Sequence, residues 1–140
     1  MNRAAFDDYI ARFNNRDVSG FEMYIASDMK MLNGALEFTG VEGMKEHYVE
    51  KIWPHFDERL NVLGFVASDS NAAVRMRTVF TARADGDTLF GPVKKGQRFV
   101  YLGVIFYDIR DSRFTSITVA YNSFRSITPD GTETELGMPH

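Results

Sequence analysis

The chain has 140 residues, of which 44% are hydrophobic and 25% charged, a balance that fits one globular domain with a core of its own. A net charge of -3 argues against a nucleic-acid surface, because binding to phosphates depends on lysine and arginine. There is no cysteine, which excludes disulfides and thiol chemistry, and the acidic residues near the N-terminus are not those of a signal peptide. We therefore expect a cytoplasmic protein without nucleic-acid or membrane partners.

The N-terminal segment predicts two helices. Apolar side chains recur there at helical spacing and fall on one face of a first helix: Phe6, Tyr9, Ile10 and Phe13. Asp17 can cap a second helix that runs from Val18 to about Ser27.

A short hairpin and a third helix follow. Residues 29–33 and 36–39 have the composition of two strands, and Asn33-Gly34 between them favours a tight turn. Residues 41–53 then predict a helix, which Pro54 ends.

The second half of the chain predicts long strands. Four segments are rich in β-branched and aromatic residues: 59–68, 72–84, 97–109 and 114–128. Residues 99–107 are apolar at both alternating positions, so both faces of that strand should be buried. Helices can cover one face, and a homodimer is the simplest way to cover the other.

Three helices followed by an antiparallel meander indicate an α+β domain with helices packed on one face of a sheet. We assign residues 1–128 to this single domain. Residues 129–140 are expected to form a polar C-terminal tail.

Four segments in this order resemble the nuclear transport factor 2-like superfamily, which includes ketosteroid isomerases, SnoaL-like polyketide cyclases, limonene epoxide hydrolases and scytalone dehydratases. They are YIARFNNRD, IASDMKMLNG, FTGVEGMKEHY and VIFYDIRDSRFTSITVAYNSF. The resemblance implies a cone-shaped α+β barrel, in which three N-terminal helices pack in a curved, mainly antiparallel sheet. It also implies a deep, mostly apolar cavity and dimerisation through the convex face of the sheet.

The resemblance to ketosteroid isomerases places Tyr9 where that family has a tyrosine that donates a hydrogen bond to the enolate. The catalytic base of the family would fall near Leu32 or Asn33, and its second acid near Gly103. None of these three residues can take up a proton, so an ordinary isomerase dyad is not expected.

The epoxide hydrolases and cyclases of the superfamily also depend on carboxylates that this sequence does not place at the matching positions. Their Arg-x-Asp strand corresponds to a segment with Arg75 and Arg77 but no acid, and the aspartate of their last strand aligns with Asn122. The amide of Asn122 can orient a substrate but takes up no proton. If Arg75 and Arg77 lie on the concave face they can hold an anion; on the convex face they are surface charges.

Histidines and aromatic residues supply the remaining candidates. His55 follows Pro54 near the expected cavity mouth and is either a proton shuttle or a solvated residue, whereas His47 is expected to be structural. Five aromatic side chains are candidates for the lining as a set, although core packing is the favoured role of any single one: Phe13, Tyr24, Trp53, Phe56 and Tyr101. No spacing of histidines and acids predicts a metal site, and no cofactor is implied.

Two functional hypotheses and one structural alternative follow. In the first, the protein binds a polyketide-, steroid- or terpenoid-like molecule and isomerises, cyclises or dehydrates it by proton transfer, with Tyr9 as donor and Asn122 and His55 in supporting roles. In the second, it binds such a ligand without turnover, which the missing carboxylates favour. An assembly domain whose cavity is filled by side chains is the third alternative.

Overall fold

The computed structural model describes residues 1–137, so the last three residues of the expected tail lie outside the described part. The helical elements are α1 (Arg3–Asn14), α2 (Ser19–Tyr24), α3 (Gly40–Met44) and the π-helix η1 (Lys45–Ile52). The strands are β1 (Ile25–Asn33), β2 (Leu36–Thr39), β3 (Phe56–Ala67), β4 (Asn71–Ala82), β5 (Gly86–Thr88), β6 (Gly91–Val93), β7 (Arg98–Arg110), β8 (Arg113–Ile127) and β9 (Glu133–Glu135).

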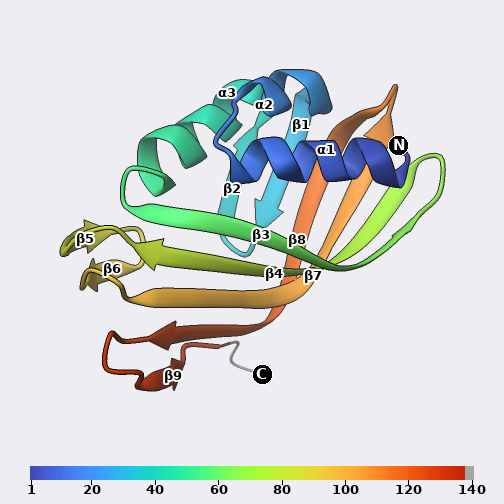
Figure 1. Cartoon of the computed structure of the whole chain (residues 1–140). Coiled ribbons are helices and arrows are strands. Elements are labelled where there is room, and N and C mark those ends of the chain that lie inside the picture. The colour runs from blue at the N-terminus through green and yellow to red at the C-terminus, as the bar shows by residue number, and fades with distance from the viewer. Residues whose placement is uncertain (138–140) are drawn as a thin grey trace.

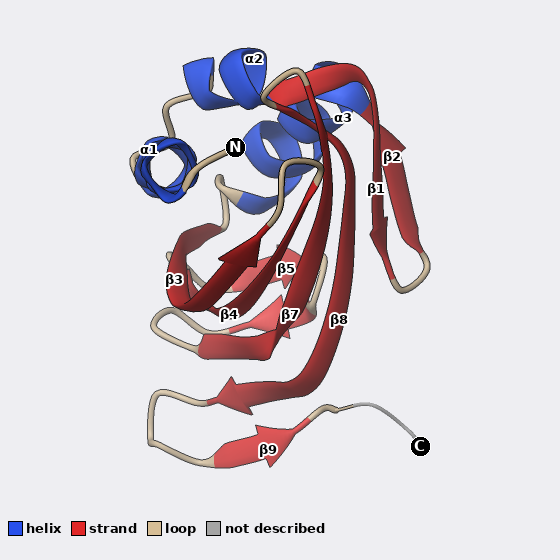
Figure 2. Cartoon of the chain, turned by 90° about the vertical axis from the view of Figure 1, so that its right-hand side faces the viewer, coloured by secondary structure: helices blue, strands red, loops and turns tan. Residues whose placement is uncertain are grey.

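The helices lie on the concave side of a strongly curved sheet, as Figures 1 and 2 show from two directions. The strand order is β2-β1-β8-β7-β4-β3, with β9 added beside β8. Only the β1–β8 pair is parallel among the paired strands of residues 1–137. The predicted α+β class with a mainly antiparallel sheet is therefore confirmed, and the sheet is open, with β2 and β3 at the ends of the strand order.

Several boundaries differ from those expected. The second helix ends at Tyr24 rather than near Ser27, because Ile25 already pairs with Phe114 of β8. The first long strand begins at Phe56, three residues before the predicted start at Arg59. Residues 84–96, which connect two of the predicted strands, contain the small β5–β6 hairpin, and the tail contributes β9.

The first helix packs as its periodicity predicts, with Phe6, Tyr9, Ile10 and Phe13 as its buried residues. The ring of Phe6 is fully buried and lies 5.1 Å from Phe65 and 5.4 Å from Tyr107. At the end of α1, the Asn14 amide donates to the carbonyl of Leu60 at 3.0 Å, and the Leu60 N–H donates back to Asn14 at 2.8 Å. These two bonds fix the end of α1 to β3.

Residues on β7 alternate between the two faces of the sheet. Tyr107 is buried on the helix side, whereas Val104 and Phe106 are 45% and 46% exposed on the convex side. Arg75 pairs in register with Val104, and Arg77 pairs with Leu102. Both arginines are exposed and share this convex face, so the alternative in which they clamp an anion inside the cavity does not apply.

Candidate functional site

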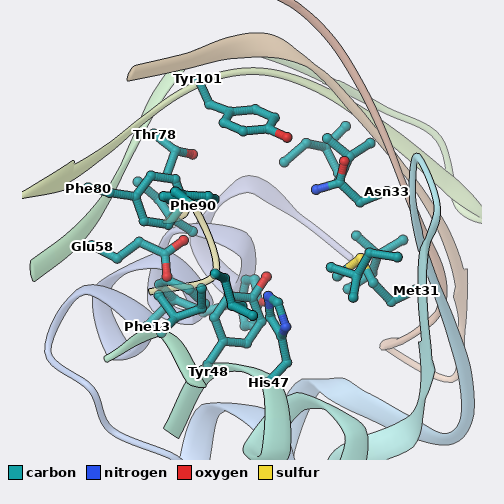
Figure 3. Close-up of a pocket in the computed structure, with 18 of the residues that line it drawn as sticks. Phe13, Met31, Asn33, His47, Tyr48, Glu58, Thr78, Phe80, Phe90 and Tyr101 are labelled. Carbon is teal, nitrogen blue, oxygen red and sulfur yellow. The ribbon is translucent and has the colours of Figure 1, made fainter. Parts of the chain in front are cut away.

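A cavity of about 320 Å³ lies between the helices and the concave face of the sheet (Figure 3). Its wall is mainly aromatic and aliphatic and includes Phe13, Tyr48, Phe80, Phe90, Tyr101 and Tyr107. A cavity of this size and polarity is typical of sites for small molecules. The assembly alternative, which required a solid core, is not what the structure shows.

Among the described residues that line this cavity, Glu58 is the one with an acidic side chain. It lies on β3 two residues after Phe56, so the alternation of the strand turns it inward with that buried ring. The side chain is 8% exposed, and its Oε1 atom has no hydrogen-bond partner among the described residues. Figure 3 shows the carboxyl group directed into the cavity, with Phe80 and Phe90 on one side and Phe13 and Tyr48 on the other.

Burial raises the pKa of Glu58 to about 8, because an apolar environment disfavours the carboxylate. The indole N–H of Trp53 and the more distant Arg16 partly oppose this rise in pKa. Within residues 1–137, neither the Nε1 atom of Trp53 nor the Oε1 atom of Glu58 has a hydrogen-bond partner. At pH 7 Glu58 is therefore mostly a neutral carboxylic acid and can donate a proton.

Tyr9 lines the same cavity and is 4% exposed. Its ring packs edge-on against Phe114 at 5.0 Å and Tyr24 at 5.9 Å. Burial raises the pKa of the Tyr9 hydroxyl, and the charge of Glu58 adds to the rise. The hydroxyl therefore stays protonated at neutral pH and can act only as a neutral hydrogen-bonding group.

Asn33 and Tyr101 lie on the other side of the cavity from Glu58, whereas His47 lies beside Tyr48 (Figure 3). Burial raises the pKa of Tyr101 to about 12. Burial and the nearby Lys51 lower the pKa of His47 to about 4, so its imidazole is neutral at pH 7. The His47 ring stacks on Phe38 with centroids 5.1 Å apart.

The turn between β5 and β6 closes part of the cavity. Leu89 and Phe90 both line the wall, and Leu89 is 54% exposed to solvent on its other side. The Phe90 ring lies 4.9 Å from Phe99 and 5.1 Å from Phe80. This hairpin therefore forms part of the binding site rather than a simple connection.

The structure brings together some of the residues predicted for the site. Tyr9, Phe13, Asn33 and Tyr101 line the cavity. Gly103 lines a small adjoining void of about 30 Å³.

Three aromatic residues predicted to line the cavity lie outside it. The Tyr24 hydroxyl donates to Asp8 at 2.6 Å, at the surface of α1. Trp53 and Phe56 are buried in the core behind the cavity wall.

The three polar residues expected to assist Tyr9 are outside the cavity. His55 is exposed in the turn after η1. Asn122 is exposed on β8 and borders a shallow hollow on the convex side together with Arg77 and Arg125. Arg75 is exposed on the same convex face, so the geometry gives none of these three a part in the chemistry of the cavity.

Sequence reasoning missed Glu58 and misjudged His47. The expectation that the site has lost its carboxylates was wrong, because Glu58 supplies one from a strand start that was placed three residues too late. Had the strand begun at Phe56, alternation would have turned Glu58 inward. His47, which was expected to be structural, lines the cavity from a segment that is a π-helix rather than the predicted α-helix.

Residues 1–137 contain no cluster of three or more histidines and acids that could hold a metal ion. None of the helices in this part of the chain has the length and apolar character needed to cross a bilayer.

The SnoaL-like domain family matches residues 6–117. No curated protein sequence matched the chain. Among solved structures, a candidate polyketide cyclase from Xanthomonas campestris pv. campestris is 21% identical with a TM-score of 0.71, over 85% of this chain and 88% of that one. A candidate ketosteroid isomerase from Kribbella flavida is 23% identical with a TM-score of 0.61, over 85% and 76%. An LEH-like epoxide hydrolase from M. tuberculosis is 9% identical with a TM-score of 0.63, over 85% and 80%. At these identities the likeness establishes the shared fold.

Proposed function

The chain belongs to the SnoaL-like domain family of the nuclear transport factor 2-like superfamily, and on this basis we propose that it binds a small hydrophobic molecule and acts on it by proton transfer. The reaction is an isomerisation, cyclisation or dehydration of a ring-bearing compound of the polyketide, steroid or terpenoid type. The observation that carries this proposal is the buried carboxyl of Glu58, directed into an otherwise apolar cavity.

Glu58 is suited to acid catalysis because burial keeps it protonated near pH 7. A carbonyl or hydroxyl oxygen of the ligand placed beside it would accept the proton. An unsatisfied Oε1 atom also favours a ligand that completes its hydrogen bonding, since a buried polar atom without a partner is costly.

Tyr9 supports this chemistry as a neutral hydrogen-bonding group that lines the same cavity as Glu58. Asn33 and Tyr101 lie apart from Glu58 and would hold a second polar group of the ligand, which sets its direction in the cavity. The aromatic side chains between these two sets of polar groups would contact the rings.

Binding without turnover is the second candidate. Glu58 is the one acidic residue of the described lining, and His47 is only a weak base because its pKa is lowered. The cavity therefore offers an acid but no strong base, and proton-transfer catalysis commonly uses both.

A ligand screen followed by product analysis separates these two functions. The fluorescence of Trp53, the one tryptophan of the chain, reports occupancy because this residue adjoins Glu58. Bound compounds are then incubated with the wild type, Glu58→Gln and Tyr9→Phe, and the mixture is analysed by mass spectrometry and NMR. Turnover that falls at least about 100-fold in Glu58→Gln supports the enzyme. Binding with no product from any bound compound supports the binding module, and full turnover in Glu58→Gln removes Glu58 from the mechanism.

We also propose that the convex face of the sheet forms a homodimer. Val104, Phe106 and Val66 are all exposed on this side of the sheet, the last at 68%. Large apolar side chains gathered on an uncovered sheet face favour self-association. Sedimentation should give a dimer for the wild type and a monomer for Val104→Arg; a wild-type monomer at micromolar concentration contradicts the proposal.

A further inference from the structure

The cavity around Glu58 is lined without positively charged side chains among the described residues, because its lining includes no lysine or arginine. Arg16, the cation that affects Glu58, bonds to Asp57 and to the carbonyl of Phe56 and so is engaged outside the cavity. A negative charge on a ligand would therefore meet no positive side chain in this wall.

A positive charge would meet several favourable groups. Ring faces attract cations through their π electrons, and Figure 3 shows the rings of Phe13, Phe80, Phe90 and Tyr48 around the Glu58 carboxyl. The carboxylate of Glu58, once it has lost its proton, would pair with the same charge. In an apolar environment such an ion pair is much stronger than in water.

We infer that the cavity favours a hydrophobic ligand, or a reaction intermediate, that carries positive charge beside Glu58 over one that carries negative charge. This inference rests on the proposed function and narrows it to reactions with a cation-like intermediate. Enolate chemistry would place an anion in the same position, where the wall offers hydroxyl groups and a neutral imidazole but no cation.

Dehydration of an alcohol illustrates the step. Glu58 gives its proton to the hydroxyl oxygen, the C–O bond breaks with its electron pair leaving on water, and the carbon becomes positive beside the new carboxylate. The carboxylate then takes a proton from the adjacent carbon, and the electron pair of that C–H bond forms a double bond. Glu58 ends protonated as it began, and the alcohol has become an alkene and water.

Three probes with the same rings and different charges test the inference. They are 2-naphthylmethylamine, which is an ammonium ion at pH 7, the uncharged 2-naphthylmethanol, and 2-naphthoate, an anion. Titration calorimetry at pH 7 should show the amine binding about tenfold more tightly than the alcohol, and the anion most weakly. In Glu58→Gln the amine should lose this advantage over the alcohol.

Asp57→Asn is the matched control for net charge. Asp57 is the neighbour of Glu58 on β3 but points outward, where it pairs with Arg16 and Arg83. The amine should keep its preference in this variant. Loss of the preference in both variants would show attraction to the overall negative charge and would overturn the inference.

Proton release gives a second readout that needs no variant. Besides Arg16, the titratable groups that interact with Glu58 are Tyr9 from α1 and Tyr48 from η1. Burial raises the pKa of both hydroxyls, so neither changes its charge near pH 7, and Trp53 does not titrate. Binding of the amine at pH 7 should therefore release about one proton from Glu58, measured in two buffers with different ionisation enthalpies, and binding of the alcohol should release none. Amine binding without proton release, or anion binding as tight as that of the amine, overturns the inference. Failure of the alcohol to bind counts instead against the proposed ligand site itself.

Discussion

Replacing Glu58 by glutamine should make the protein more stable at alkaline pH. The folded-state pKa of Glu58 is about 8, against an ordinary value of 4.5. Between these values the unfolded chain loses the proton of this residue while the folded chain keeps it. The stability that Glu58 contributes is therefore fully present below pH 4.5 and is lost as the pH rises through 8.

The size of this loss follows from the two pKa values. Each pKa unit corresponds to about 1.4 kcal/mol, so the free energy of unfolding of the wild type should lose on the order of 5 kcal/mol from this residue across the window. Glutamine has a similar shape and carries no titrating proton. The Glu58→Gln protein should match the wild type near pH 4.5 and exceed its stability by several kcal/mol at pH 8.5.

Urea denaturation of both proteins at half-unit steps from pH 4.5 to 8.5 measures this difference. Unfolding is followed by far-UV circular dichroism and by the fluorescence of Trp53, which is 5% exposed in the folded chain. Taking the difference between the two proteins cancels every group that they share. Asp57→Asn removes the same formal charge from the exposed side of β3 and controls for net charge.

Two results would refute this reasoning. Parallel stability curves for the wild type and Glu58→Gln would mean that Glu58 titrates alike in the folded and unfolded chains. A variant that gains stability toward acid rather than toward alkali would mean that Glu58 is held as a carboxylate in the folded protein.

Three further changes test other parts of the structure. Gly103→Ala should destabilise the fold by more than about 2 kcal/mol, because a Cβ there would lie 2.4 Å from the backbone of β8. Gly64→Ala is the control and should be tolerated, since its Cβ would meet only an ordinary contact at 3.7 Å. Equal melting temperatures of the two variants would contradict this prediction. Asn14→Ala should cost about 1–3 kcal/mol in urea unfolding, because two hydrogen bonds to the backbone of Leu60 are lost, and an unchanged midpoint would mean that water replaces them. The His47→Gln protein should lose less free energy of unfolding than the wild type as the pH falls from 6.5 to 4, because the folded wild type keeps His47 neutral while its unfolded chain binds a proton there. Thermal melting curves that shift equally with pH in both proteins would disprove the lowered pKa of His47.

Much of the fold could be predicted from hydrophobic periodicity. The stripe of α1, the turn at Asn33-Gly34 and the long strands each follow from local patterns that the folded chain retains. These features depend on residues close together in sequence, which is why one sequence suffices for them. The prediction that both faces of residues 99–107 are buried is not met within the chain itself, where Val104 and Phe106 are exposed on the convex side, and its burial by a second copy stays a prediction.

The site was harder to predict, because it depends on strand phase and on helix type. A start at Arg59 instead of Phe56 hid the orientation of Glu58. Asn122 matched a family position in the sequence, yet it lies at a β-bulge between the partners of Leu102 and Gly103 and is exposed on the convex side. The burial that raises the pKa of Glu58 comes from residues on α1, η1, β4 and the β5–β6 turn, and no local pattern joins these segments.

The π-helical hydrogen bonding of η1 determines which side chains of this segment reach the cavity. The backbone N–H of Trp53 donates to the carbonyl of Tyr48, five residues earlier, at 2.8 Å. A turn closed by such a bond contains one residue more than a turn of an α-helix. This spacing brings His47 and Ile52, also five apart, onto the cavity wall together. In an α-helix, side chains five residues apart point about 140° apart, so this segment could not place both on the cavity wall with α-helical hydrogen bonding. A change from π-helical to α-helical hydrogen bonding in this segment would therefore alter the wall of the cavity while every strand of the sheet stays the same.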